Sequence, residues 1–217
     1  MGIVQFSIPK SLVLKFHEFK PIDNFIETGT YLGGTTFWAA AQFDKVYTIE
    51  IDQKLSQAAA ATPGCPANVE FLVGDSKSVL PELMQRQLPG TCLFWLDGHW
   101  CLGGGGKDQE CPLIDELTAI QSRQEAIILI DDARCFLGPL PPPHEADHWP
   151  RIDEVFRKIT ELFPAHRFTI LDDVIVVLPP AYFPVFDSEW KRGFQQRFFP
   201  KPQKSMLARM KRKLFGT

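Results

Sequence analysis

A glycine-rich turn between two predicted strands constrains the fold of this chain more than any other feature. Residues 24–28 form an apolar strand pattern that runs into a turn containing Gly29 and Gly33. A second predicted strand, residues 45–50, ends in the acid Glu50. Glycines allow a tight turn and let backbone N–H groups approach a ligand closely. A helix predicted directly after the turn adds unpaired amides at its N-terminus. The pattern predicts the start of a parallel α/β sheet with a site for a nucleotide-like ligand.

The spacing of the glycines narrows the choice of ligand. Glycines at positions 29, 33 and 34 do not fit G-x-G-x-x-G, which argues against a nicotinamide-dependent oxidoreductase. No Gly-Lys-Ser/Thr follows either, so a phosphate-binding loop is not indicated. Glu50 lies 21 residues after Gly29, where an acid can bind ribose hydroxyls. Glu27, expected to face the ligand, would repel a pyrophosphate and favour a cationic ligand.

These residues resemble the first motifs of the class I S-adenosylmethionine-dependent methyltransferases. That family has an acid, then x-Gly-x-x-x-Gly, and a second strand that ends in an acid. Its cofactor carries a ribose, an ammonium and a sulfonium but no phosphate. The resemblance implies S-adenosylmethionine as cofactor, held by Glu27, Thr28, Gly29, Gly33, Thr35, Glu50, Ile51, Asp75, Ser76 and Asp97. Asp75 and Ser76 would contact the adenine, although an acid before a helix is also a common N-cap.

The remaining chain alternates predicted strands and helices. Further strands are expected at residues 69–73, 92–96, 126–130, 167–171 and 174–178, and helices at 53–61, 77–87, 112–122 and 151–162. Continuous apolar strands fit burial on both faces of a parallel sheet. The last two strands, joined by Asp172 and Asp173, read as a β-hairpin. The resemblance implies a Rossmann-like three-layer α/β sandwich, with a seven-stranded, mostly parallel sheet and a C-terminal antiparallel hairpin.

Three segments are expected along the chain. Residues 1–21 form a lead-in with a short helix, and residues 22–180 form the domain that resembles methyltransferases. Residues 181–217 form a basic C-terminal tail. The length of 217 residues suits one domain with such extensions.

Acids also end the predicted fourth and fifth strands. Asp97 follows the fourth strand, and Asp131 and Asp132 follow the fifth. Their placement is similar to that in metal-dependent sugar O-methyltransferases related to macrocin O-methyltransferase. The resemblance implies that these three aspartates hold Mg²⁺, with Asp97 and His99 as catalytic residues and His99 as the base. An imidazole ordinarily titrates in the useful range for this role.

Other interpretations of these acids stay open. Asp131 and Asp132 could only cap loops, and His99 could be an ordinary surface histidine. Many of the similar enzymes carry an aspartate where this chain has His99, and the residues after it do not match their continuation. Arg134 could pair with the acids or with an anionic substrate.

The predicted function is methyl transfer from S-adenosylmethionine to a hydroxyl of a small molecule or sugar. The acceptor cannot be read from the sequence, because specificity would lie in the loops at 99–111 and 133–150. A non-catalytic binding module on the same fold, serving as a scaffold for a partner or a membrane, is the alternative. Homo-oligomer formation is left open.

Charge is distributed unevenly along the chain. Every residue of formal charge after Glu189 is basic: Lys191, Arg192, Arg197, Lys201, Lys204, Arg209, Lys211, Arg212 and Lys213. The first 189 residues hold the other 14 basic and all 26 acidic residues, a net charge of −12. Residues 205–215 could form an amphipathic helix on an anionic membrane surface. A solvated tail, or packing of that helix on the acidic domain, is the alternative, and no recognition motif indicates nucleic acid.

Targeting signals are not evident in the sequence. No apolar run is long enough to span a membrane, and the first residues lack a secretory signal pattern. The five cysteines are an odd number without a C-x-x-C pair, which favours reduced thiols. A cytoplasmic protein is therefore expected, with peripheral membrane contact through the basic tail as an option.

Overall fold

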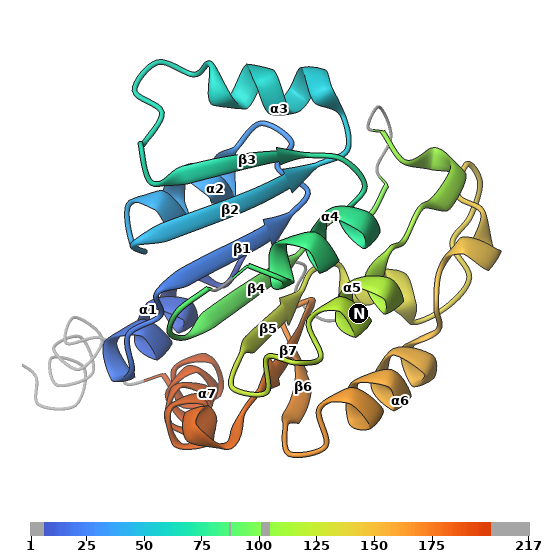
Figure 1. Cartoon of the computed structure of the whole chain (residues 1–217). Helices are drawn as coiled ribbons and strands as arrows, with labels where there is room; N and C mark the ends of the chain where they lie inside the picture. The colour runs from blue at the N-terminus through green and yellow to red at the C-terminus, as the bar shows by residue number, and fades with distance from the viewer. Residues whose placement is uncertain (1–6, 87, 101–104, 201–217) are drawn as a thin grey trace, which may run out of the picture. The chain divides into compact units, whose positions relative to one another are not determined.

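The computed structural model describes residues 7–86, 88–100 and 105–200. Seven strands form one sheet: β1 Asn24–Thr28, β2 Lys45–Glu50, β3 Val69–Val73, β4 Cys92–Leu96, β5 Ile127–Ile130, β6 Arg167–Leu171 and β7 Val174–Leu178. Their order across the sheet is β3-β2-β1-β4-β5-β7-β6 (Figure 1). All neighbouring strands are parallel except β7, which pairs antiparallel with β5 and β6. The predicted fold class is confirmed.

Six α-helices accompany these strands in the first part of the chain: α1 Lys10–Phe19, α2 Gly34–Ala40, α3 Gln53–Ala60, α4 Ser76–Met84, α5 Leu113–Ala119 and α6 Ile152–Leu162. Short 3₁₀ turns lie between some of them: η1 Lys107–Gln109, η2 Ala133–Phe136, η3 Ala146–His148 and η4 Pro180–Tyr182. Several helices are shorter than the sequence predicts. For example, α5 ends at Ala119 rather than near residue 122, and α4 ends at Met84 rather than near residue 87.

Helices cover both faces of the sheet and make three layers. In Figure 1, α4, α5 and α6 lie in front of the strands, and α1 and α2 lie behind them. On the rear face, the Phe43 ring contacts His17 of α1, Trp38 of α2 and Phe25 of β1. The front face holds the largest apolar cluster, which joins strand residues such as Phe94 and Ile128 to the helices. The buried strands β1, β4, β5 and β7 are covered along their whole length.

The turn between β6 and β7 explains an unusual pair of aspartates. Asp172 and Asp173 both have positive φ angles, 47° and 79°, as a tight hairpin turn requires. Asp173 is buried, and its carboxylate accepts the backbone N–H of Arg134 at 2.9 Å. Its carbonyl oxygen accepts the N–H of Ala133 at 2.8 Å. The residue therefore serves both the turn and the loop after β5, a role that glycine could not fill.

Parallel pairing brings the carboxyl ends of the first five strands to one edge of the sheet. Thr28 of β1 pairs with Ile49 of β2 and with Leu96 of β4. Leu96 in turn pairs with Ile130 of β5. The residues that follow these strands therefore share one edge, which is where ligands bind in open α/β sheets.

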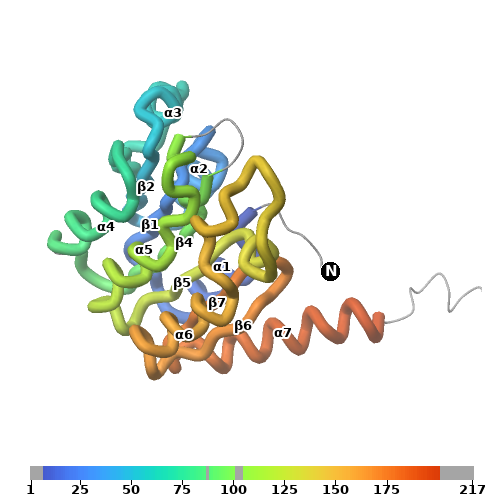
Figure 2. The backbone as a smooth tube through the Cα atoms, turned by 90° about the vertical axis from the view of Figure 1, so that its right-hand side faces the viewer, coloured from blue at the N-terminus to red at the C-terminus, as the bar shows by residue number. Residues whose placement is uncertain are grey.

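The chain divides into two compact units, Met1–Phe183 and Pro184–Thr217. The second unit contains nearly all of α7, Phe183–Phe198, which is a continuous helix (Figure 2). Among the residues that the structure describes, no helix combines the length and apolar character needed to cross a membrane. The amphipathic helix predicted for residues 205–215 falls outside the described residues.

Candidate active site

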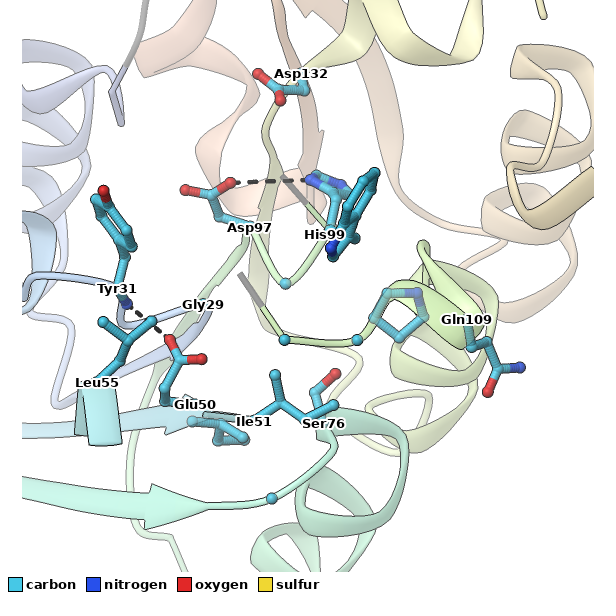
Figure 3. Close-up of a pocket in the computed structure, with 17 residues that line it drawn as sticks. Gly29, Tyr31, Glu50, Ile51, Leu55, Ser76, Asp97, His99, Gln109 and Asp132 are labelled. Atoms are coloured by element: carbon cyan, nitrogen blue, oxygen red, sulfur yellow. Dashed lines mark hydrogen bonds and ion pairs between the residues drawn. The ribbon is translucent and has the colours of Figure 1, made fainter. Parts of the chain in front are cut away.

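A cavity of about 220 Å³ opens at the carboxyl edge of the sheet (Figure 3). Several of the residues predicted for the site line it: Gly29, Glu50, Ile51, Ser76, Asp97, His99 and Asp132. They come from the ends of β1, β2, β4 and β5 and from the start of α4. Glu27, Thr28, Gly33, Thr35, Asp75 and Asp131 do not line the cavity. The carboxyl-edge location agrees with the prediction, while the binding role of each residue stays a prediction.

Gly29 fixes the floor of the cavity between β1 and β4. Its φ is 85°, and a Cβ placed on it would lie 2.1 Å from the carbonyl oxygen of Asp97. Its N–H donates to the carbonyl of Ile49 at 2.8 Å. No side chain fits this position, because both the backbone conformation and the space exclude one. The glycine therefore allows the loops after β1 and β4 to touch directly under the cavity.

Glu50 presents a carboxylate that the backbone holds in place. Its Oε2 accepts the N–H of Tyr31 at 2.8 Å, and its Oε1 accepts the N–H of Asp52 at 3.0 Å. Tyr31 has a φ of 47°, so its amide is turned toward the end of β2 by an uncommon backbone conformation. Each carboxylate oxygen still has a free lone-pair direction, and the residue lines the cavity. A fixed acceptor of this kind suits a pair of ribose hydroxyls.

Glu27 lies deeper than the sequence suggested. It is 1% exposed, and its Oε2 accepts hydrogen bonds from the hydroxyls of Thr48, at 2.8 Å, and of Thr36. Burial raises the pKa of this carboxyl to about 7, although the two threonine hydrogen bonds oppose the shift. Its oxygen contacts join β1, β2 and α2. The structure thus gives Glu27 a role in joining these elements, and a direct contact with a cofactor stays a prediction.

Asp75 and Ser76, in the turn after β3, have different roles in the structure. Asp75 is the N-cap of α4, since its Oδ1 accepts the N–H of Lys77 at 3.1 Å. The N-cap interpretation of this aspartate is therefore confirmed. Ser76 instead lines the cavity and is buried. An adenine contact at this turn thus depends on Ser76 and Gly74, which also lines the cavity, more than on the Asp75 side chain.

Three of the predicted cofactor residues support the turn from behind the cavity. The Thr28 hydroxyl accepts the N–H of Asp97 at 3.2 Å. Gly33 has a φ of 78° and is the N-cap of α2, where a Cβ would lie 2.7 Å from the Phe37 ring. Thr35 belongs to the first turn of α2 and does not line the cavity. These residues shape the loop after β1, which is what the glycine pattern predicts.

The side chains of Asp97 and His99 lie close to each other in the lining of the cavity (Figure 3). The His99 Nδ1 lies 3.8 Å from Asp97 Oδ1. The imidazole stacks on Trp149, with ring centroids 5.4 Å apart, and meets Phe136 edge-on at 5.7 Å. Burial by this aromatic packing lowers the pKa of His99 to about 4. The expectation that His99 titrates near neutral pH is therefore wrong, because burial favours its neutral form, while its role as the base stays a prediction.

The pKa of Asp97 is shifted in the opposite direction, upward. Desolvation, followed by the charges of Asp131 and Asp132, raises the pKa of Asp97 well above its usual value. Burial also raises the pKa of Asp131 to about 7. An acid with a raised pKa is a better proton acceptor than an ordinary carboxylate once it is ionised. The pKa values of the two groups are thus shifted in opposite directions, that of the carboxyl upward and that of the imidazole downward.

The three aspartates predicted to hold Mg²⁺ do not form a ligand set. Asp131 is buried, and its Oδ1 accepts the N–H of Asp132 at 2.8 Å. Asp132 has a φ of 56° and pairs with the Arg134 guanidinium at 2.7 Å. Arg134 also pairs with Asp173. Within the described residues, no group of three His, Cys, Asp or Glu side chains is placed to hold a metal ion. Arginine therefore supplies the positive charge at the end of β5, and a magnesium site is not supported.

Glu110 is an important residue that the sequence did not reveal. Its carboxylate is fully buried and accepts hydrogen bonds from three groups: Trp149 Nε1 at 2.7 Å, His144 Nδ1 at 2.9 Å and the Glu145 N–H at 3.0 Å. Its carbonyl oxygen accepts the N–H of Trp100 at 2.7 Å. The residue thus joins the loop after β4 to the loop after η2. These are the two loops in which the sequence analysis expects specificity to lie.

Glu116 is a second buried acid that sequence reasoning missed. It projects from α5 beneath the cavity floor, where its Oε1 would lie 3.0 Å from a Cβ on Gly98. Burial raises the pKa of Glu116 to about 7, while Ser76 and Thr28 oppose the shift. A single charged residue on a predicted helix carries no signal of such burial. Together with Glu27, Asp97 and Asp131, it makes the surroundings of the cavity favourable for a cation.

Comparison by sequence and by structure gives different results. No protein-family model and no curated protein matches the chain. Solved structures do match. An O-methyltransferase from Bacillus cereus in complex with S-adenosylhomocysteine has a TM-score of 0.57 and 14% identity, covering 80% of this chain and 82% of that chain. Human methyltransferase-like protein 13, also with S-adenosylhomocysteine, has a TM-score of 0.55 and 13% identity, covering 89% and 92%.

The same architecture also serves other transfers. A spermidine synthase in complex with a transition-state analogue matches with a TM-score of 0.50 and 12% identity, covering 89% of this chain and 64% of that chain. Identities this low describe the fold and leave the acceptor open. The narrower resemblance to macrocin O-methyltransferase is not confirmed by these matches. The chain has the fold of the class I S-adenosylmethionine-dependent methyltransferases, at low sequence identity to them.

Proposed function

We propose that this protein binds S-adenosylmethionine and transfers its methyl group to a hydroxyl of a small molecule or sugar. The observation that carries the proposal is Glu50, a buried carboxylate at the end of β2 that two backbone amides hold at the cavity wall. The fold and the carboxyl-edge cavity support the same ligand. The glycine turn after β1 also supports this ligand, because the spacing of its glycines does not fit the dinucleotide-binding motif.

The cavity offers separate groups for the ribose, the adenine and the positive charges of the cofactor. Glu50 would accept hydrogen bonds from the ribose hydroxyls. Ile51 and Leu55 supply apolar surface for the adenine, and Ser76 lies next to them. The acids around Asp97 would stabilise the positive charges of the ligand, because opposite charges attract strongly at a partly desolvated site. A phosphate-bearing ligand would meet repulsion from the same acids.

Asp97 is proposed to accept the proton of the acceptor hydroxyl. S-adenosylmethionine, when bound, supplies a methyl group on a cationic sulfur that departs as a neutral sulfide. The nearby positive charge of the bound cofactor would lower the pKa of Asp97 and so favour its ionised form. When the methyl group is transferred, the sulfur loses its positive charge, and the pKa of Asp97 would rise again. The carboxylate would then take the hydroxyl proton as the oxygen–carbon bond forms.

His99 is proposed to orient the acceptor rather than to act as the main base. Its lowered pKa keeps the ring neutral, and a neutral imidazole has one donor and one acceptor nitrogen. The ring is fixed by Trp149 and Phe136, so a hydroxyl bound to it would sit in a defined position. Such positioning can supply a large part of the rate acceleration in a methyl transfer.

Ligand binding by the full-length protein tests the proposal. Isothermal titration calorimetry would compare S-adenosylmethionine, S-adenosylhomocysteine and NAD⁺. We expect the first two to bind and NAD⁺ not to bind. Selective binding of NAD⁺ would overturn the proposal, as would the absence of heat with either sulfur ligand. Incubation with methyl-labelled S-adenosylmethionine and hydroxylated acceptors then measures turnover. Binding without turnover across a broad acceptor panel would favour the non-catalytic module.

A further inference from the structure

The second unit carries a row of exposed aromatic side chains on α7. Trp190, Phe194 and Phe198 are 48%, 42% and 58% exposed, although large aromatic side chains are usually covered. Their spacing of four residues places them on one side of the helix. Neighbouring rings touch: the centroids of Trp190 and Phe194 are 5.1 Å apart, and those of Phe194 and Phe198 are 4.6 Å apart. We call these three residues the aromatic stripe.

Phe199 extends the apolar surface at the end of the helix. It is 68% exposed, and its ring centroid lies 6.2 Å from that of Phe194. A contiguous exposed patch of this kind generally marks a binding surface. The four neighbouring exposed aromatic side chains therefore indicate that this face of α7 binds a partner.

Basic residues flank the aromatic stripe on both sides. With 3.6 residues per turn, Lys191 and Arg197 lie about 60° to either side of the centre of the stripe. Glu189 is the last acidic residue in the sequence, and it pairs with Arg192 within α7. Six further Lys or Arg residues follow Pro200. The apolar stripe is thus bordered by cations and followed by a segment without acids.

We propose that the aromatic stripe of α7 binds the surface of an anionic lipid bilayer. Aromatic side chains favour the boundary between headgroups and acyl chains. Long Lys and Arg side chains can bury their apolar stems there and extend their charges to the headgroups. An interfacial helix needs both features on adjacent faces. A nucleic acid would use the cations but would leave the continuous stripe largely unexplained.

Vesicle sedimentation with the full-length protein tests this surface. Vesicles of phosphatidylcholine alone would be compared with vesicles that also contain phosphatidylserine. We expect sedimentation with the anionic vesicles only and a marked decrease at high salt. Trp190→Ala/Phe194→Ala should reduce binding by about tenfold or more, because the buried apolar area is lost. Lys191→Gln/Arg197→Gln should reduce binding by about tenfold, because each cation contributes to attraction by the anionic surface.

Matched control variants distinguish loss of the aromatic stripe from the loss of any exposed apolar side chain or cation. Leu137→Ala removes an exposed apolar side chain elsewhere, and Lys20→Gln/Lys54→Gln removes two exposed cations elsewhere. Both should sediment like the wild type. The proposal fails if the wild type does not bind anionic vesicles, or if the aromatic double variant binds them equally well.

Other partners of the stripe would give different signals. Sedimentation velocity would detect a dimer that disappears in Trp190→Ala/Phe194→Ala, and an RNA oligonucleotide would detect nucleic-acid binding. Either signal without vesicle binding would overturn the membrane proposal. Binding of S-adenosylhomocysteine should be unchanged in the α7 variants, so this test is independent of the proposed methyl transfer.

Discussion

The indole nitrogen of Trp149 donates a 2.7 Å hydrogen bond to the carboxylate of Glu110, although 39 residues separate them in the sequence. The same Trp149 ring stacks on His99, which lines the cavity. Glu110 also accepts from His144 and from the backbone of Glu145. The position of His99 therefore depends on an acid that does not line the cavity.

Replacement of Glu110 should uncouple the two loops. Glu110→Ala leaves the buried indole N–H of Trp149 without a partner and removes the acceptor of the part-buried Glu145 N–H, which should cost about 1–3 kcal/mol of unfolding free energy. Glu110→Gln keeps one acceptor oxygen and should lose less. Urea unfolding measures the difference, and Asp108→Ala, an exposed acid of the same loop, is the control. If Glu110→Ala were as stable as the control, the joining role would be refuted.

Gly29 and Gly34 offer a matched pair for testing the cavity floor. Gly29→Ala forces a Cβ to within 2.1 Å of a carbonyl oxygen at a φ of 85°. We expect a loss of about 3 kcal/mol or more of stability, as for strained or overpacked sites. We also expect weakened binding of S-adenosylhomocysteine. Gly34→Ala meets nothing within 4 Å and should be nearly neutral. Thermal unfolding with and without ligand measures both, and equal behaviour of the two variants would contradict the packing described.

Cofactor binding should depend on pH in a predictable direction. Glu27 and Asp131 have pKa values raised to about 7, and that of Asp97 is raised as well. Glu27 and Asp131 are therefore expected to hold protons in the free protein below neutral pH, and a bound cation favours the ionised forms of all three carboxyls. Binding of the cationic S-adenosylmethionine should therefore release protons and tighten by about threefold to tenfold from pH 6 to pH 8.

S-adenosylhomocysteine is the matched control for this pH dependence, because it lacks the sulfonium charge. Its affinity should rise less over the same range. Calorimetry in buffers of different ionisation enthalpy would measure both the affinity and the number of protons released. A constant ratio of the two affinities from pH 6 to pH 8 would exclude the proposed coupling between the acids and the sulfonium.

Magnesium should have little effect on this protein. Arg134 pairs with Asp132, Asp131 accepts a backbone N–H, and no group of three acidic, His or Cys side chains in the described part of the chain is placed to hold a metal ion. Titration of the wild type with Mg²⁺ or Mn²⁺ should give no specific heat, and Asp131→Ala should match it. Saturable binding that disappears in Asp131→Ala would restore the predicted metal site.

The sequence predicts much of the fold because the buried strands are short apolar runs with clear ends. Strands β1, β2, β3, β4, β6 and β7 have the predicted bounds, and β5 differs by one residue. The seven-stranded, mostly parallel sheet with its C-terminal antiparallel hairpin came from family resemblance rather than from periodicity, since an apolar run does not specify its neighbours in a sheet. Helix ends were less accurate, because capping and local turns determine them.

The candidate site was only partly predictable. Glu50 ends its strand and Asp97 directly follows one, so the location of both acids at the sheet edge can be read from the sequence. Glu110 acts through contacts with residues up to 39 positions away, and no local pattern indicates such contacts. The pKa of His99 was mispredicted for the same reason, because its shift comes from burial against Phe136 and Trp149.

The most direct test of the account is the affinity of S-adenosylhomocysteine for the wild type and for Glu50→Ala. Loss of a charged acceptor for two ribose hydroxyls should weaken binding by about tenfold to a hundredfold. Glu82→Ala, an exposed acid on α4, is the control and should bind like the wild type. Tight binding by the wild type that is lost only in Glu50→Ala is the predicted result. Equal binding by Glu50→Ala and the wild type, or no binding by either, would contradict the account.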